Sequence, residues 1–194
     1  MGRIKSAIEI ALERTESVKG DKASIEQFEA KQRGKKMAND FIYGELKSLE
    51  EEIKKIPKEQ RASLKQGIFE VLLSQVTLPN TLDDEKRIEM VGKGLQVILA
   101  NAKFSAMYRQ FLQAVTQYLS DVARYDELIR QQYAPKLQQK EEELSRRYGR
   151  TIQLDPFQDS EFVLFYNQNM TMLRENYQKM VDQVQEQARL LYKE

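Results

Sequence analysis

Acidic side chains are the groups in this sequence best suited to metal-dependent chemistry. They occur as three runs of three: Glu50-Glu51-Glu52, Asp83-Asp84-Glu85 and Glu141-Glu142-Glu143. Carboxylates one helical turn apart can hold magnesium for phosphate chemistry. Three consecutive residues of a helix, however, spread over about 200° of its surface and do not converge on one ion. Each run also has Lys or Arg neighbours for helical charge pairing. The spacing therefore predicts charge pairing and no metal site.

Catalytic chemistry is further restricted because the chain contains neither cysteine nor histidine. Thiol nucleophiles, disulfides, Cys/His zinc sites and a Ser-His-Asp triad are excluded. Gly92-Lys93-Gly94 resembles part of a phosphate-binding loop, but Leu95 follows it and no strand is predicted before it. A hinge or a close helix crossing explains these glycines better. We therefore predict a protein that is not an enzyme and that needs no cofactor.

A basic cluster consisting of Lys31, Arg33, Lys35 and Lys36 is the best candidate for binding phosphate groups. On one or two helical turns these side chains could contact nucleic acid or lipid phosphates. The formal net charge of the chain is only +1, which supplies no general attraction to polyanions. No aromatic residue lies among the four for base stacking. A solvated helix face is therefore favoured, and nucleic-acid or phosphate binding is the alternative function.

Long helices must position all of these side chains. The 194 residues include only 8 Gly and 4 Pro, while 41% are hydrophobic, a usage typical of packed helices. The longest apolar run covers residues 162–166, far short of the ~20 residues of a membrane span. Glu9 and Glu13 interrupt any apolar run of a signal peptide. The sequence predicts no transmembrane segment and a cytoplasmic location.

The periodicity of apolar residues predicts three long helices, over about residues 24–55, 82–133 and 157–192. Shorter helices are expected to brace them. The fold class is therefore all-α, an elongated bundle of mainly antiparallel helices. We predict a single domain over residues 1–194, in which residues 1–22 form a loosely attached amphipathic helix.

Two positions are expected to interrupt these helices. Gly20-Asp21 is predicted to end a first short helix over about residues 3–18, and the Ser24–Gln27 pair to begin the next as a capping box. Pro135 is predicted to kink or end the second long helix near Tyr133, and Leu137, Leu144 and Tyr148 are predicted to continue helical structure for a few turns until Gly149.

An aromatic stripe within the second long helix could line a ligand cavity. Its members are Phe104, Tyr108, Phe111, Tyr118 and Tyr125. Such spacing is more typical of core packing, which we favour.

The last predicted helix carries a heptad-like apolar seam, which is the candidate partner interface. Its members are Met170, Leu173, Tyr177, Met180, Val184 and Leu191. Gln187 interrupts the seam where a permanent coiled coil would place an apolar residue, so a modest interface is expected. We predict a non-catalytic interaction or structural protein that self-associates as a homo-oligomer or binds a partner helix.

Overall fold

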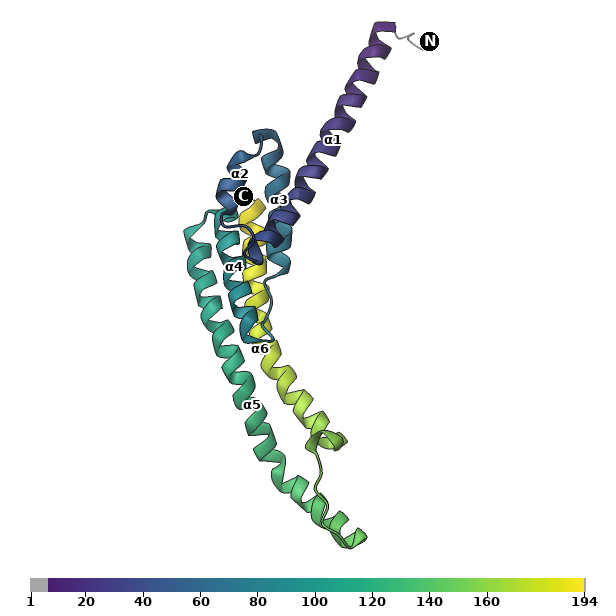
Figure 1. Cartoon of the computed structure of the whole chain (residues 1–194), viewed down its shortest axis with the longest axis vertical. Helices are drawn as coiled ribbons and strands as arrows, with labels where there is room; N and C mark the ends of the chain where they lie inside the picture. Colours follow the sequence, from purple (N-terminus) through teal and green to yellow (C-terminus); the bar gives the residue numbers. More distant parts are fainter. Residues whose placement is uncertain (1–6, 194) are drawn as a thin grey trace. The chain divides into compact units, whose positions relative to one another are not determined.

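The computed structural model describes the backbone of residues 7–193 and the side chains of residues 24–81 and 83–193. All regular structure in these residues is helical, which confirms the all-α prediction. The helices are α1 (Ala7–Ile42), α2 (Leu49–Lys55), α3 (Lys58–Ser74), α4 (Leu82–Leu99), α5 (Ala102–Tyr148) and α6 (Ser160–Lys193), and the 3-10 turn η1 (Pro156–Gln158) precedes α6 (Figure 1). None of the described helices has the length and apolar content of a membrane span.

Contacts divide the chain into two compact units. Unit 1 comprises Met1–Gln75 and Glu89–Asn101, and unit 2 comprises Val76–Ile88 and Ala102–Glu194. The boundary falls inside α4, whose first turns belong to unit 2. The single domain over residues 1–194 stays a prediction.

Two glycines let α1 and α3 cross closely in unit 1. A Cβ atom added to Gly34 would collide with the carbonyl oxygen of Leu64, and one added to Gly67 would collide with the carbonyl oxygen of Lys31. The two backbones are therefore in direct contact, and no side chain fits between them. Ala38 and Leu64 are fully buried beside this crossing.

The end of α4, which belongs to unit 1, packs against α2 and α3 through another glycine. A Cβ atom on Gly94 would lie 2.8 Å from Cδ1 of Leu72 and 3.3 Å from Cδ1 of Leu49. Gly94 thus marks close helix packing, one of the two explanations that the sequence context of Gly92-Lys93-Gly94 predicted.

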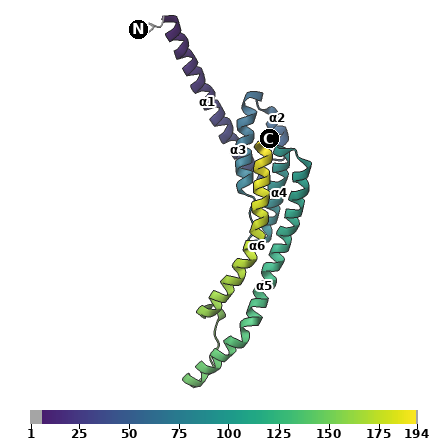
Figure 2. The ribbon, with the colours of Figure 1, turned by 180° about the vertical axis from the view of Figure 1, so that it is seen from behind.

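In unit 2, α5 and α6 run antiparallel beside each other, as Figures 1 and 2 show from opposite sides. The buried cluster between them contains Ile129, Tyr133 and Phe162. Partly buried neighbours pack against it: Tyr125, Leu137, Phe165, Tyr166 and Met170. Nearer the start of α5, Tyr108 is fully buried and its hydroxyl donates a hydrogen bond to the carbonyl of Ile88 at 2.8 Å.

The predicted aromatic stripe of α5 is buried in the core over its first half. Phe104, Tyr108 and Phe111 are buried, while Tyr118 and Tyr125 are half-buried. The core-packing interpretation therefore holds for the first three residues.

The predicted single helix over residues 24–55 is wrong, because α1 begins before residue 24 and the chain is not helical between Ile42 and Leu49. α1 runs through Gly20-Asp21 without a break, because a single helical glycine costs only about 1 kcal/mol. It ends at Ile42, where Gly44 adopts a positive φ of 80° and its N–H bonds to the carbonyl of Phe41. A new helix, α2, then begins after Ser48. The remaining residues of the expected first helix, 3–6, lie outside the described part.

The predicted helix over residues 82–133 is also wrong, because α4 ends at Leu99 and α5 begins at Ala102. Ala100 between them has a φ of 48°, which no α-helix accommodates. Pro135 does not end α5, which continues to Tyr148. The helix curves over its C-terminal half, which contains Pro135 (Figure 1). The last long helix begins at Ser160 instead of residue 157 because η1 comes first.

Candidate functional site

The predicted seam of α6 faces its own chain. Leu173 and Val184 are 6% and 2% exposed, and Met170 packs against the Ile129 cluster. Tyr177, Met180 and Leu191 are half-buried. In this conformation the two most buried members offer almost no surface to a partner.

The basic cluster is split between two faces of α1. Lys31 Nζ lies 2.6 Å from one carboxylate oxygen of Glu70 on α3, and Lys35 Nζ lies 3.5 Å from the other. The hydrogen bond from Lys31 lowers the pKa of the Glu70 carboxyl. Arg33 and Lys36 are exposed on the opposite side of the helix. Two of the four basic residues thus support the glycine crossing, and two face solvent.

Two tyrosine–aspartate hydrogen bonds join α6 to α5, and a third joins α5 to the link that precedes α6. The donor and acceptor pairs are Tyr177 and Asp121 at 2.6 Å, Tyr166 and Asp126 at 2.9 Å, and Tyr133 and Asp159 at 2.9 Å. In each pair the phenol donates and the carboxylate accepts. These pairs, which we call the Tyr–Asp ladder, hold the hairpin in register from its open end to its loop.

The loop end of the ladder carries the densest charged network of unit 2. Lys140 Nζ lies 2.7 Å from Asp159 Oδ2 and 2.6 Å from Glu161 Oε2. The hydrogen bond from Lys140 lowers the pKa of the Asp159 carboxyl, and the same bond raises the pKa of Lys140. A general acid needs a raised carboxyl pKa, so these shifts have the opposite sign. The network can fasten the 149–159 link to α5.

The unfolding free energy at alkaline pH should depend on the Tyr177–Asp121 pair of the Tyr–Asp ladder. Burial, and then the bond to Asp121, raise the pKa of Tyr177 to about 12. A raised folded-state pKa contributes stability that is complete below the unfolded value of about 10 and is lost as the pH rises toward 12. We expect the unfolding free energy to fall across this window in urea titrations followed by circular dichroism. Tyr177→Phe should reduce that fall without abolishing it, because the pKa values of Tyr133 and Tyr166 are raised as well.

Tyr148→Phe is the matched control for this pH dependence, because Tyr148 is exposed. Its variant should retain the full loss of stability between pH 10 and 12. An identical pH profile for Tyr177→Phe and the wild type would contradict the role assigned to the ladder.

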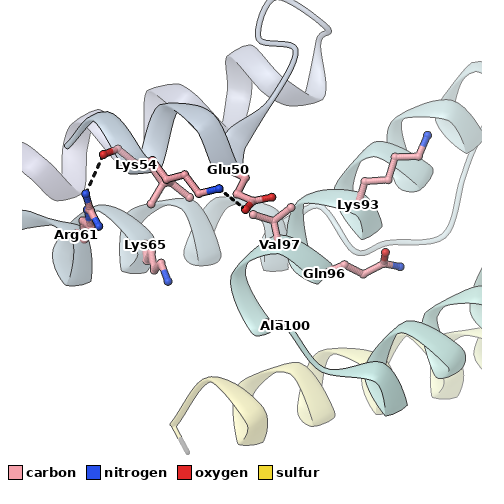
Figure 3. A pocket seen from close by; sticks show the side chains of 9 residues that line it. Glu50, Lys54, Arg61, Lys65, Lys93, Gln96, Val97 and Ala100 are labelled. Atoms are coloured by element: carbon pink, nitrogen blue, oxygen red, sulfur yellow. Dashed lines mark hydrogen bonds and ion pairs between the residues drawn. The ribbon is translucent and has the colours of Figure 1, made fainter. Parts of the chain in front are cut away.

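A cavity of about 560 Å³ lies in unit 1 between α2, α3 and the last turns of α4 (Figure 3). Its lining combines four cations with one carboxylate, polar Gln96 and an apolar wall. The lining residues are Glu50, Ile53, Lys54, Arg61, Lys65, Lys93, Gln96, Val97 and Ala100.

Sequence reasoning did not find this cavity, although α3 carried a signal. Arg61 and Lys65 stand four residues apart, and neither has an acidic residue three or four positions away. Most other charged residues of the chain have such a partner, for example Lys54 with Glu50 and Lys93 with Glu89. Unbalanced basic residues on one helix face can attract an anion.

In the residues that the structure describes, these features are helices packed in two units, a polar Tyr–Asp ladder and a basic cavity. The chain belongs to a family described as a family of unknown function (DUF6657), whose model matches residues 50–190. The match spans every cavity residue and leaves α1 outside it. Comparisons with curated proteins and with solved structures found no match.

Proposed function

We propose that this chain is a non-catalytic interaction protein that self-associates through the part of α1 that precedes Gly34. The observation that carries this proposal is the exposure of two large apolar side chains on that helix. Ile25 is 57% exposed and Phe28 is 62% exposed. Such residues on one helix face are typical of a surface that a partner covers.

The geometry of unit 1 supports this choice of surface. Ile25 and Phe28 lie on the side of α1 away from Gly34, so α3 does not cover them. In Figures 1 and 2 the N-terminal part of α1 extends past α2 and α3 of the same unit. In the sequence, Ala11, Val18 and Ile25 recur every seven residues, the repeat of a coiled-coil seam.

The charge pattern of α1 favours a second copy of the same helix in antiparallel orientation. Acidic residues dominate its first half, with Glu9, Glu13, Glu16 and Asp21 against Arg14 and Lys19. Basic residues outnumber acidic ones in its second half, with Lys22, Lys31, Arg33, Lys35 and Lys36 against Glu26, Glu29 and Asp40. Lys31 and Lys35 are also paired with Glu70 of the same unit. An antiparallel pair places each half opposite its complement, which sets orientation and partner choice.

Sedimentation equilibrium tests the proposal. The wild type should form a dimer, and Phe28→Glu should weaken the dimer at least tenfold because it places a charge in an apolar seam. Leu164→Glu on α6 is the matched control, since Leu164 is 61% exposed, close to the 62% of Phe28, and its substitution also introduces a glutamate. A wild type that stays monomeric, or equal weakening by both variants, would refute self-association through α1.

The nucleic-acid alternative has less support, because Lys31 and Lys35 already pair with Glu70. We also propose a cytoplasmic location, which the sequence predicts.

A further inference from the structure

The basic cavity of unit 1 contains two cations that no carboxylate balances. Lys54 is paired with Glu50 at 2.7 Å, and Lys93 is paired with Glu89 at 2.7 Å. Within the described residues, Arg61 and Lys65 form no ion pair. Both are only partly exposed. The cavity therefore carries an excess positive charge that arises from α3.

Arg61 is held rigidly at the edge of this cavity. Its Nε donates to the carbonyl of Ile56 at 2.7 Å, and its Nη2 donates to the carbonyl of Lys54 at 2.8 Å. These bonds satisfy carbonyls at the end of α2, so one task of Arg61 is structural. They also fix the plane of the guanidinium group and leave other N–H donors free. An anion that binds there meets a cation that needs no further ordering.

Lys65 has no such structural task. It lies one helical turn beyond Arg61 on α3, at the four-residue spacing that places two side chains on the same face. Two cations at this separation can contact oxygen atoms of a single phosphate group.

The remaining wall of the cavity is apolar and ends in a strained residue. Ile53 is buried, and Val97 and Ala100 complete this side. Ala100 holds a φ of 48°, a conformation rare for residues other than glycine, while its N–H bonds to the carbonyl of Gln96 at 2.9 Å. Strained residues of this kind concentrate at ligand sites. Figure 3 shows Val97 and Ala100 on the α4 side, across from Arg61 and Lys65.

We infer that this cavity binds a small organic phosphate, with the phosphate group on Arg61 and Lys65 and the apolar body against Val97. The volume of about 560 Å³ lies within the range of small-molecule pockets, roughly 300–1,000 Å³. One phosphate group carries close to two negative charges at neutral pH and so balances the two unpaired cations. This inference does not depend on self-association through α1.

Isothermal titration calorimetry at low ionic strength tests the inference with phenyl phosphate as the probe. The wild type should bind phenyl phosphate more tightly than inorganic phosphate, because the ring covers the apolar wall, and it should not bind phenol. Lys65→Gln should weaken binding about tenfold or more, since it removes one charge-assisted hydrogen bond. Lys65→Arg should restore most of the affinity.

Lys36→Gln is the matched control, because it removes the same charge from an exposed position of α1 in the same unit. Its affinity for phenyl phosphate should equal that of the wild type. Absence of binding to the wild type would overturn the inference. Equal losses in Lys36→Gln and Lys65→Gln would also overturn it, because the attraction would then be unspecific. Equal affinity for phenyl phosphate and inorganic phosphate would overturn the placement of the ligand's apolar body against Val97.

Discussion

Gly67→Ala is expected to destabilise unit 1 by about 3 kcal/mol and to separate α1 from α3. Alanine normally stabilises an exposed helix relative to glycine by about 1 kcal/mol, so the expected sign is reversed here. The reason is that the new Cβ would collide with the carbonyl oxygen of Lys31. A backbone atom cannot rotate away, so the whole of α1 must shift and the contacts around Gly34 are lost.

Urea unfolding followed by circular dichroism measures this effect. Gly94→Ala serves as the control, because its Cβ would meet the flexible end of Leu72 instead of a backbone atom. Gly94→Ala should lose clearly less unfolding free energy than Gly67→Ala, since a leucine side chain can change rotamer. A Gly67→Ala protein as stable as the wild type would show that the two helices do not cross at this point.

Val184→Glu is expected to unfold the packing of α6, with a loss of about 4 kcal/mol or more. Val184 is 2% exposed, so the new carboxylate would be buried. The described core contains no buried polar or charged residue that could pair with it. Thermal unfolding should therefore begin at a much lower temperature, with loss of helical signal.

Leu190→Glu provides the comparison on the same helix, because Leu190 is 49% exposed. Its stability should stay within about 0.5 kcal/mol of the wild type. A Val184→Glu protein that stays fully helical and merely loses a subunit would return the α6 seam to the role of a subunit interface, as its heptad-like spacing suggested.

Helical periodicity predicted where the helices lie but not where they end. The apolar stripes of α5 and α6 repeat over many turns, and that repetition made both helices recognisable. The break after Ile42 depends on Gly44 and on Ser48, whose side chain accepts a bond from the N–H of Glu51. The Ser-x-x-Glu pattern at Ser48 and Glu51 is a capping signal. The helical spacing of the apolar residues continues across it, however, and predicted an unbroken helix. The break at Ala100 left no signal, because alanine favours helices.

The candidate sites were harder to predict because they depend on contacts between distant segments. Gly34 could be seen in the sequence, but nothing there identified Gly67 as its partner across the crossing. The cavity needs Lys54, Arg61 and Val97 from three helices, and only the unbalanced charges of α3 were visible beforehand. The α6 seam was recognised correctly as apolar, yet periodicity alone does not distinguish a core face from a subunit interface.

The Tyr–Asp ladder implies an order of events in the folding of unit 2. Its three pairs are separated by 26, 40 and 56 residues along the chain, and the separation grows from the loop toward the open end. The entropic cost of closing a loop rises with its length, so Tyr133 and Asp159 meet at the lowest cost. Each closed pair then shortens the loop that the next one must close. The hairpin should zip from its loop, and Tyr177, the last to engage, should govern the unfolding rate more than the folding rate.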